Sequence, residues 1–200
     1  GTTQSCRARL LVNAAGPCAN RILEKVTPKP KKRNFDLVAG THIIFDTPPP
    51  RGMFYVEAPQ DQRAVFVMPW KGKTMIGTTE KVFEGNPSKL APTTEEEKYL
   101  CEVASRYFSQ FKGYSTGNIE SSFAGLRVLP HASGKAFSRP RETTLHTDKM
   151  IAPRVATVYG GKLTAYRVTA EKVVAKFAKK LPPRTRKAWT HSLQLTRVKT

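Results

Sequence analysis

The chain has 200 residues, of which 39% are hydrophobic and 24% charged, and its formal net charge at pH 7 is +19. This length suffices for one well-packed core, or for one domain and part of another. No apolar run approaches the ~18 residues of a membrane-spanning helix, so we expect no transmembrane segment. The three cysteines are far apart and no His/Cys spacing fits zinc, so we predict no metal site.

The positive charge gathers around residues 25–33 and beyond Lys162. Such a balance favours anionic partners, namely nucleic acid, an anionic membrane surface or small anionic substrates. A solvated basic surface without a partner remains open. The basic residues do not alternate with aromatic ones along one element and no nucleic-acid motif occurs, so we expect no specific nucleic acid.

The first predicted elements are a buried strand over residues 8–13 and a short helix over 19–26. The turn between them contains Gly16, and a strand–turn–helix unit is typical of α/β nucleotide-binding folds. Gly16 could bring backbone close to a ligand, or it could simply make a tight corner.

A Pro/Lys connector over 27–34 precedes a change of texture. Short β-type runs separated by turn signals then predict an antiparallel meander. The runs cover residues 37–45, 53–57, 64–69 and 73–78. His42 lies in the first of them; a lone histidine on a strand is usually structural, and a functional role stays open.

A helix is predicted from Thr93 or Thr94, each followed three residues later by an acid as in a capping box, and it ends at Gly113. Residues 119–129 form the next long strand, with Arg127 between two apolar neighbours. Burying an arginine is costly unless it is paired or bound to an anion, so Arg127 is a candidate site residue.

The last clear unit is a β-rich run over 155–159, the pair Gly160 and Gly161, then Lys162 and a helical pattern that stops before Pro182. Paired glycines at a strand–helix corner bring backbone, free N–H groups and the helix dipole to one place. With Lys162 beside them, they predict an anion-binding corner, although plain turn chemistry is an alternative. Neither G-x-G-x-x-G nor G-x-x-x-x-G-K-[ST] occurs.

Six short motifs in order resemble the FAD-dependent glycerol-3-phosphate dehydrogenases of the D-amino-acid-oxidase-like flavoprotein superfamily. They are V-N-A-A-G-P (12–17), G-T-H-I-I-F (40–45), V-F-V-M-P-W (65–70), I-G-T-T-E (76–80), G-L-R-V-L-P (125–130) and G-G-K-L-T-A-Y-R (160–167). The resemblance covers roughly residues 9–181. An amine or amino-acid oxidase of the same superfamily remains the alternative.

The resemblance implies a mixed α+β and α/β fold in a discontinuous arrangement. Residues 36–148 would form an inserted substrate domain with a mixed, largely antiparallel sheet plus helices. Residues 1–35 and 149–181 would be incomplete pieces of a Rossmann-type FAD-binding domain, and 182–200 a basic linker. We therefore expect a central fragment of a longer enzyme, inactive and without FAD when isolated.

The resemblance also implies roles for individual residues. His42, Arg127 and Lys162 would be catalytic and would bind the substrate, with His42 as a general base. Contacts to FAD would come from Ala15, Gly16, Pro17, Gly160, Gly161, Lys162, Leu163 and Thr164.

The implied reaction oxidises sn-glycerol 3-phosphate to dihydroxyacetone phosphate, with a hydride passing to the flavin and electrons to a quinone. Arg127 and Lys162 would supply positive charge for a dianionic substrate. The implied location is cytoplasmic and peripheral, at the anionic surface of the inner membrane.

Overall fold

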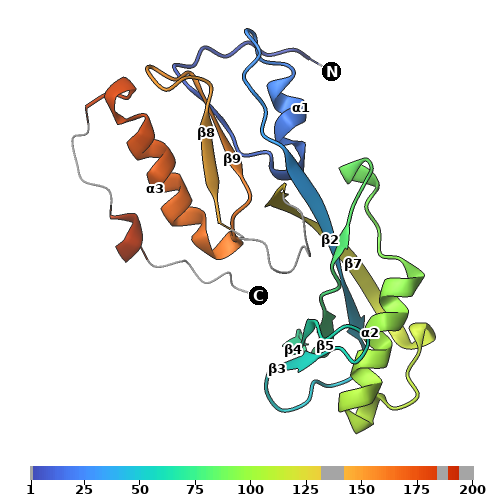
Figure 1. Cartoon of the computed structure of the whole chain (residues 1–200). Coiled ribbons are helices and arrows are strands. Elements are labelled where there is room, and N and C mark those ends of the chain that lie inside the picture. The colour runs from blue at the N-terminus through green and yellow to red at the C-terminus, as the bar shows by residue number, and fades with distance from the viewer. Residues whose placement is uncertain (1, 132–141, 184–188, 194–200) are drawn as a thin grey trace. The chain divides into compact units, whose positions relative to one another are not determined.

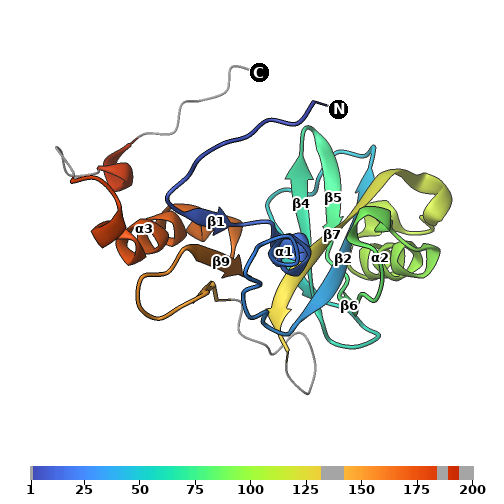
Figure 2. The same ribbon diagram turned by 90° about the horizontal axis from the view of Figure 1, so that it is seen from above.

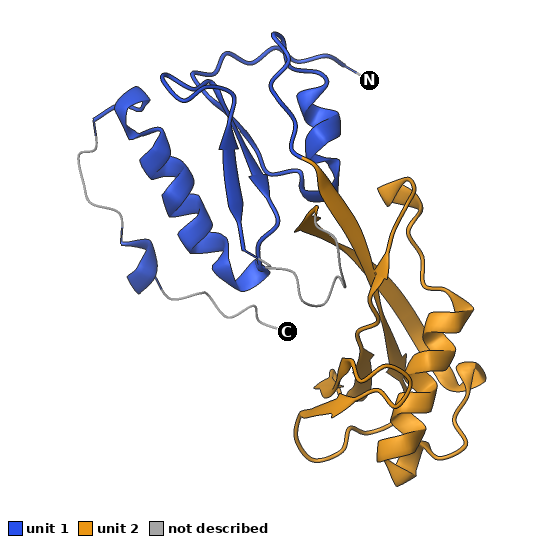
Figure 3. Cartoon of the chain, viewed as in Figure 1, with its two compact units in different colours: residues 1–33, 140–200 blue, residues 34–139 orange. Residues whose placement is uncertain are grey.

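The computed structural model describes residues 2–131, 142–183 and 189–193. The chain divides into two compact units, one formed by residues 1–33 and 140–200 and the other by residues 34–139 (Figure 3). Each unit has its own sheet, and each is described below by itself.

The unit of residues 34–139 is built on a largely antiparallel sheet in which β3, β4, β5, β2 and β6 are neighbours in that order, with β7 paired to β2 (Figure 1). Its strands are β2 (Phe35–Phe45), β3 (Phe54–Glu57), β4 (Ala64–Trp70), β5 (Lys73–Gly77), β6 (Lys81–Val82) and β7 (Ile119–Pro130). Short 3₁₀ helices cover Pro87–Lys89, Ser109–Phe111 and Thr116–Asn118.

Strand β2 is the centre of this sheet. The strands β3, β4 and β5 form the predicted meander, but β2 pairs with β5 instead of its neighbour in sequence, β3. On its other side β2 pairs with β7 from Phe35↔Pro130 to Phe45↔Ile119. Local turn signals could not show this pairing, because the partner strand lies some eighty residues further along the chain.

The helix α2 (Thr94–Tyr107) begins with the predicted capping box. Thr93 Oγ1 accepts a hydrogen bond from Glu96 N at 3.3 Å, and Glu96 Oε2 accepts one from Thr93 N at 3.2 Å. These bonds satisfy N–H groups that a helix start would otherwise leave free. The buried residues Leu100, Cys101, Val103 and Ala104 pack α2 against the sheet, where the core includes Ile43, Phe45, Val65, Val67 and Ile76.

Alternation along the strands separates this helix-covered face from the opposite one. The odd-numbered residues Ile43 and Phe45 of β2 lie in the core under α2. His42 and Gly40 therefore point to the other face, together with their cross-strand partners Phe123 and Gly125 on β7. The same rule places Arg127, the partner of Val38, on that face.

The unit of residues 1–33 and 140–200 has a three-stranded sheet of order β1–β9–β8. Strands β1 (Leu11–Asn13) and β9 (Val155–Tyr159) are parallel, and β8 (Thr144–Thr147) is antiparallel to β9. Helix α1 (Ala19–Leu23) follows β1, and α3 (Tyr166–Lys176) lies along the sheet through Val173 and Phe177 on Ala156 (Figure 2). Short 3₁₀ helices cover Gly16–Cys18, Leu163–Ala165, Ala178–Lys180 and Thr190–Ser192.

Strand β8 belongs to a different unit from the one that its sequence position suggested. The residues of β8 were expected in the inserted segment 36–148, yet they belong to the other unit. The reason is that β8 pairs with β9 from Thr144↔Tyr159 to Thr147↔Ala156, so its backbone hydrogen bonds go to that sheet.

Candidate functional site

His42 lies on the uncovered face of the sheet, in the middle of β2. Its ring stacks on Phe123 of β7 with centroids 5.0 Å apart and planes 6° from parallel. It also covers Gly77, where an added Cβ would lie 2.3 Å from His42 Cδ2. Within the described residues, the enclosed Nδ1 of His42 has no hydrogen-bond partner. Nothing but glycine at position 77 leaves room for the ring.

The surroundings of His42 keep its ring neutral. Burial lowers the pKa of His42 by disfavouring the charged imidazolium, and the positive charge of Arg127 lowers it further. A neutral imidazole at physiological pH is able to accept a proton.

Arg127 is half-buried on β7, and its guanidinium reaches back over Gly40 of β2. An added Cβ at Gly40 would lie 2.8 Å from Arg127 Nη1 and 2.4 Å from Thr78 Oγ1. Arg127 Nη2 donates a hydrogen bond to Thr78 Oγ1 at 3.2 Å. Thr78 directly follows β5, so three strands set the position of this cation.

Between His42 and Arg127 the sheet carries no side chains. Gly40 and Gly125 are cross-strand partners, and their pair stands between the pairs His42↔Phe123 and Val38↔Arg127. An added Cβ at Gly125 would meet nothing within 4 Å. The result is a glycine floor, formed by Gly40 and Gly125: the Arg127 guanidinium and Thr78 cover Gly40, Gly125 faces open space, and the imidazole of His42 stands at the far end.

The other unit carries the glycine corners that the sequence singled out. Strands β1 and β9 run parallel, so the turns that follow them lie at the same edge of the sheet. Gly16 has φ +52° with nothing within 4 Å of an added Cβ, whereas Gly160 and Gly161 have φ 67° and 96°. Ligands of α/β sheets bind outside the carboxyl ends of parallel strands, which is where these glycines lie.

The remaining predicted cofactor residues surround these corners. Ala15 and Pro17 flank Gly16, and Lys162, Leu163 and Thr164 follow Gly161, where the side chain of Leu163 is 89% exposed. A Cβ at Gly161 would lie 2.3 Å from Thr143 Oγ1. The first corner is therefore open at Gly16 and the second is closed in by Thr143 at Gly161, and the positive φ values explain why glycine occupies both.

Asn13, which sequence reasoning missed, supports the first corner. Its buried side chain donates to Ala19 O at 2.9 Å and accepts from Ala15 N at 3.2 Å, so it holds the turn that contains Gly16. Asparagine at the end of an apolar strand was the available signal, because a buried amide needs such partners.

The structure thus brings His42 and Arg127 to one site in residues 34–139. Thr78, Gly40, Gly77, Gly125 and Phe123 belong to the same site, although no role had been assigned to them. Lys162 and the FAD-contact residues are in the other unit, so their convergence on His42 and Arg127 stays a prediction.

Two kinds of feature are absent from the described parts of the chain. No group of His, Cys, Asp or Glu side chains there could hold a metal ion. Among the helices described, none is long and apolar enough to cross a membrane.

Comparison with known proteins places this geometry in a family. The chain is 35% identical over 196 residues to a glycerol-3-phosphate dehydrogenase of Pseudomonas aeruginosa, covering 95% of the chain and 37% of that protein. It is 31% identical over 197 residues to the D-erythritol 1-phosphate dehydrogenase of Brucella abortus, covering 98% of the chain and 39% of that protein. The chain therefore spans little more than a third of the length of these relatives.

A solved structure agrees with the fold. The glycerol-3-phosphate dehydrogenase of Bacillus halodurans complexed with FAD superposes with a TM-score of 0.70 at 30% identity, covering 86% of this chain and 32% of that one. The family described as DAO, FAD dependent oxidoreductase, matches residues 1–167. On this match the chain belongs to the DAO family of FAD-dependent oxidoreductases.

Proposed function

We propose that this chain is the central part of a longer flavoenzyme that oxidises sn-glycerol 3-phosphate to dihydroxyacetone phosphate. The observation that carries the proposal is the glycine floor between a neutral His42 and the Arg127 guanidinium. The printed names of two relatives add support, because both act on phosphorylated polyols.

In this proposal the neutral ring of His42 takes the proton of the substrate's C2 hydroxyl. A general base is most effective when its pKa lies near the working pH, because it is then largely unprotonated and still basic. Stacking on Phe123 and the close approach to Gly77 hold the ring in one orientation. FAD, when bound, would supply the acceptor for the hydride that leaves the same carbon.

Arg127 would hold the anionic substrate over the glycine floor. A guanidinium binds phosphate or an alkoxide-like oxygen through paired hydrogen bonds, and the bond to Thr78 fixes the plane of its donors. The same positive charge favours the neutral form of His42. Arg127 therefore serves both substrate binding and the protonation state of the base.

The two units would divide the work. We assign residues 34–139 to the substrate and the unit of residues 1–33 and 140–200 to FAD, with Gly16, Gly160 and Gly161 against the cofactor. Lys162, at the second glycine corner, would then add positive charge beside the flavin and substrate. This assignment is supported by the parallel pair β1–β9, whose carboxyl ends carry all three glycines.

For the electron acceptor we propose a quinone, and for the location the cytoplasmic surface of the inner membrane. The net charge of +19 supports the membrane location, since basic patches bind anionic lipid at about 1 kcal/mol per Lys or Arg. Co-sedimentation of the full-length protein with phosphatidylglycerol vesicles tests the proposed location. Binding should weaken steeply with added salt, and equal binding to neutral vesicles would contradict it.

A longer phosphorylated polyol is the second candidate substrate. The space above Gly125 would admit a further carbon, and the Brucella abortus relative is named for erythritol 1-phosphate. The other hypothesis, an amine or amino-acid oxidase of the same superfamily, requires an amine or amino acid as the substrate.

The deciding experiment is anaerobic reduction of the full-length protein, followed as loss of flavin absorbance near ~450 nm. Glycerol 3-phosphate, D-erythritol 1-phosphate and a panel of D-amino acids are compared at equal concentration. We expect bleaching with glycerol 3-phosphate at the highest second-order rate constant. Bleaching by an amino acid alone would overturn the proposal.

A further inference from the structure

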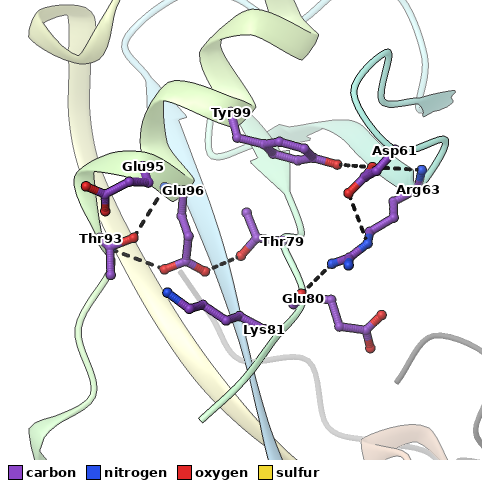
Figure 4. Close-up of a pocket in the computed structure, with 9 residues that line it drawn as sticks. All are labelled: Asp61, Arg63, Thr79, Glu80, Lys81, Thr93, Glu95, Glu96 and Tyr99. Carbon is purple, nitrogen blue, oxygen red and sulfur yellow. Dashed lines mark hydrogen bonds and ion pairs between the residues drawn. The ribbon is translucent and has the colours of Figure 1, made fainter. Parts of the chain in front are cut away.

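The loop after β5 is tied to helix α2 by a chain of hydrogen bonds that starts at Glu96. Thr79 Oγ1 donates to Glu96 Oε1 at 2.5 Å (Figure 4). The same hydroxyl oxygen accepts from Thr41 N at 2.8 Å. Thr79 N in turn donates to Thr41 O at 3.2 Å. Thr79 and Thr41 are both buried, with 6% and 0% of their surface exposed.

A second chain from the same helix reaches the next residue of the loop. Tyr99 Oη donates to Asp61 Oδ1 at 2.9 Å, and Asp61 Oδ2 pairs with Arg63 Nε at 3.1 Å. Arg63 Nη1 then donates to the carbonyl of Glu80 (Figure 4). Glu96 and Tyr99 are three residues apart and share one face of α2, so a single helix turn holds both points.

This loop leads directly to the site on the opposite face of the sheet. Thr78 Oγ1, which accepts from Arg127 Nη2, also donates to Thr79 O at 3.0 Å. Thr41, the partner of Thr79, is the residue before His42 on β2. Glu96 is therefore connected to Arg127 and to the backbone of His42 through Thr79.

On one side the loop borders open space, whereas the side chain of Thr79 is buried. A pocket of about 230 Å³ opens between the loop and α2, with Thr79 and Glu96 in its wall. Where a loop borders open space, directional hydrogen bonds decide its position. A buried hydroxyl with a charged acceptor is among the stronger bonds of this kind.

We propose that Thr79 and Glu96 are positioning residues, which hold Thr78 against Arg127 and fix β2 at His42 for substrate binding. The inference rests on the proposed function, because it concerns the same site. The side chain of Thr79 bonds to Thr41 and Glu96, and only its backbone oxygen lies near Gly40, so both side chains act through other residues. This role goes beyond the capping box, which uses Glu96 Oε2 and leaves Oε1 for Thr79.

The test uses the full-length enzyme and the variants Thr79→Val, Thr79→Ser and Ser122→Ala. Valine matches threonine in shape but removes the hydroxyl, whereas serine keeps it. Ser122→Ala is the matched control. Ser122 Oγ donates to Glu97 Oε1 at 2.6 Å, so this substitution removes another hydroxyl–carboxylate bond between α2 and the sheet. That bond does not touch the loop after β5.

For Thr79→Val we expect KM for glycerol 3-phosphate and Kd for dihydroxyacetone phosphate, measured by calorimetry, to rise about tenfold, as misplacement of a binding group predicts. Thr79→Ser and Ser122→Ala should stay within about twofold of wild type in both constants. A merely structural role would lower the amount of active enzyme and leave KM unchanged. Equal KM values in Thr79→Val and Ser122→Ala would overturn the inference.

A readout independent of turnover separates this inference from the proposed function. The Nε–Hε resonance of Arg127 is followed by NMR in the 200-residue chain and assigned with Arg127→Lys. Thr79→Val should move it toward the position of exposed arginines, while Thr79→Ser and Ser122→Ala leave it in place. If the Arg127 resonance does not move in Thr79→Val, the inference is wrong. If it moves but the full-length enzyme does not turn over glycerol 3-phosphate, only the proposed substrate is rejected.

Discussion

His42 and Arg127 are on different strands and eighty-five positions apart, yet the charge of Arg127 lowers the pKa of His42. Arg127 could be singled out from sequence because a guanidinium between Leu126 and Val128 needs a partner or an anion. Its partner Thr78 could not, because the contact depends on how β7, β2 and β5 align. The roles of Gly40, Gly77 and Gly125 could not be predicted from sequence either, since these glycines leave space for groups on neighbouring strands.

The first residue-scale prediction concerns His42→Asn. The variant keeps a polar side chain but loses the base, so the rate constant for anaerobic flavin reduction by glycerol 3-phosphate should fall about 100-fold or more. KM should change little, because Arg127 remains. His131→Asn is the control: His131 is exposed and pairs with Asp36 Oδ1 at 2.7 Å, away from the glycine floor. An unchanged reduction rate in His42→Asn would exclude the histidine as base.

A second residue-scale prediction concerns the titration of His42 by NMR in the 200-residue chain. Burial and Arg127 both disfavour the imidazolium, so its pKa should lie below the ordinary 6.5. Arg127→Gln should raise this pKa, because the repelling charge is gone, but not to the ordinary value, because burial is the larger cause. The exposed Arg51→Gln serves as control and should have no effect. A pKa above 6.5 in the wild type would contradict the assigned protonation state.

At the scale of elements, local signals were sufficient wherever the chain's neighbours in sequence are its neighbours in space. The strand Val155–Tyr159 and the capping box at Thr93 appear as predicted. The helix predicted to end at Gly113 stops earlier, at Tyr107, and a 3₁₀ turn follows at Ser109–Phe111. Pairing was harder: β2 with β7 and β1 with β9 join segments that are far apart in sequence, which turn chemistry does not encode.

The glycine floor yields a prediction about the sheet itself. Gly125→Ala places a methyl group in open space, so the unfolding midpoint should hold or rise slightly, since alanine in a strand gains ~0.5–1 kcal/mol over glycine. In the proposed function the same methyl group would occupy the substrate's place, so KM for glycerol 3-phosphate should rise severalfold.

Gly40→Ala is the matched comparison on the partner strand. Its Cβ would lie 2.4 Å from Thr78 Oγ1 and 2.9 Å from the backbone oxygen of Thr79, so the loop must shift. We expect a lower unfolding midpoint together with a higher KM, because overpacking costs typically ~1–3 kcal/mol. Thermal unfolding and steady-state kinetics on both variants check the contrast. A Gly125→Ala variant that unfolds early but binds substrate normally would contradict the glycine floor.

At the scale of the whole molecule, the sequence separated a β-rich segment from α/β-like ends, and the structure has two units with separate sheets. Division of labour between them accounts for the distribution of candidate residues. The proposed base His42 and the cation Arg127 belong to one unit, whereas the glycine corners belong to the other. A catalytic site formed by residues of both units would also need bound FAD. The affinity of the 200-residue chain for FAD would then decide whether this chain is active by itself.

The last prediction is that the 200-residue chain does not retain FAD. The proposed function places FAD at the corners of Gly16 and Gly160–Gly161, but the chain contains no G-x-G-x-x-G turn, the element that binds the pyrophosphate in Rossmann-type folds. The purified chain, incubated with FAD and desalted, should therefore show no flavin absorbance near ~450 nm, while the full-length protein treated alike should be yellow. Adding glycerol 3-phosphate should reduce no flavin in the chain's sample. Stoichiometric retention by the chain would mean that the glycine corners are sufficient to bind the cofactor, and the pyrophosphate would then have to be held by Gly16 or Gly160–Gly161.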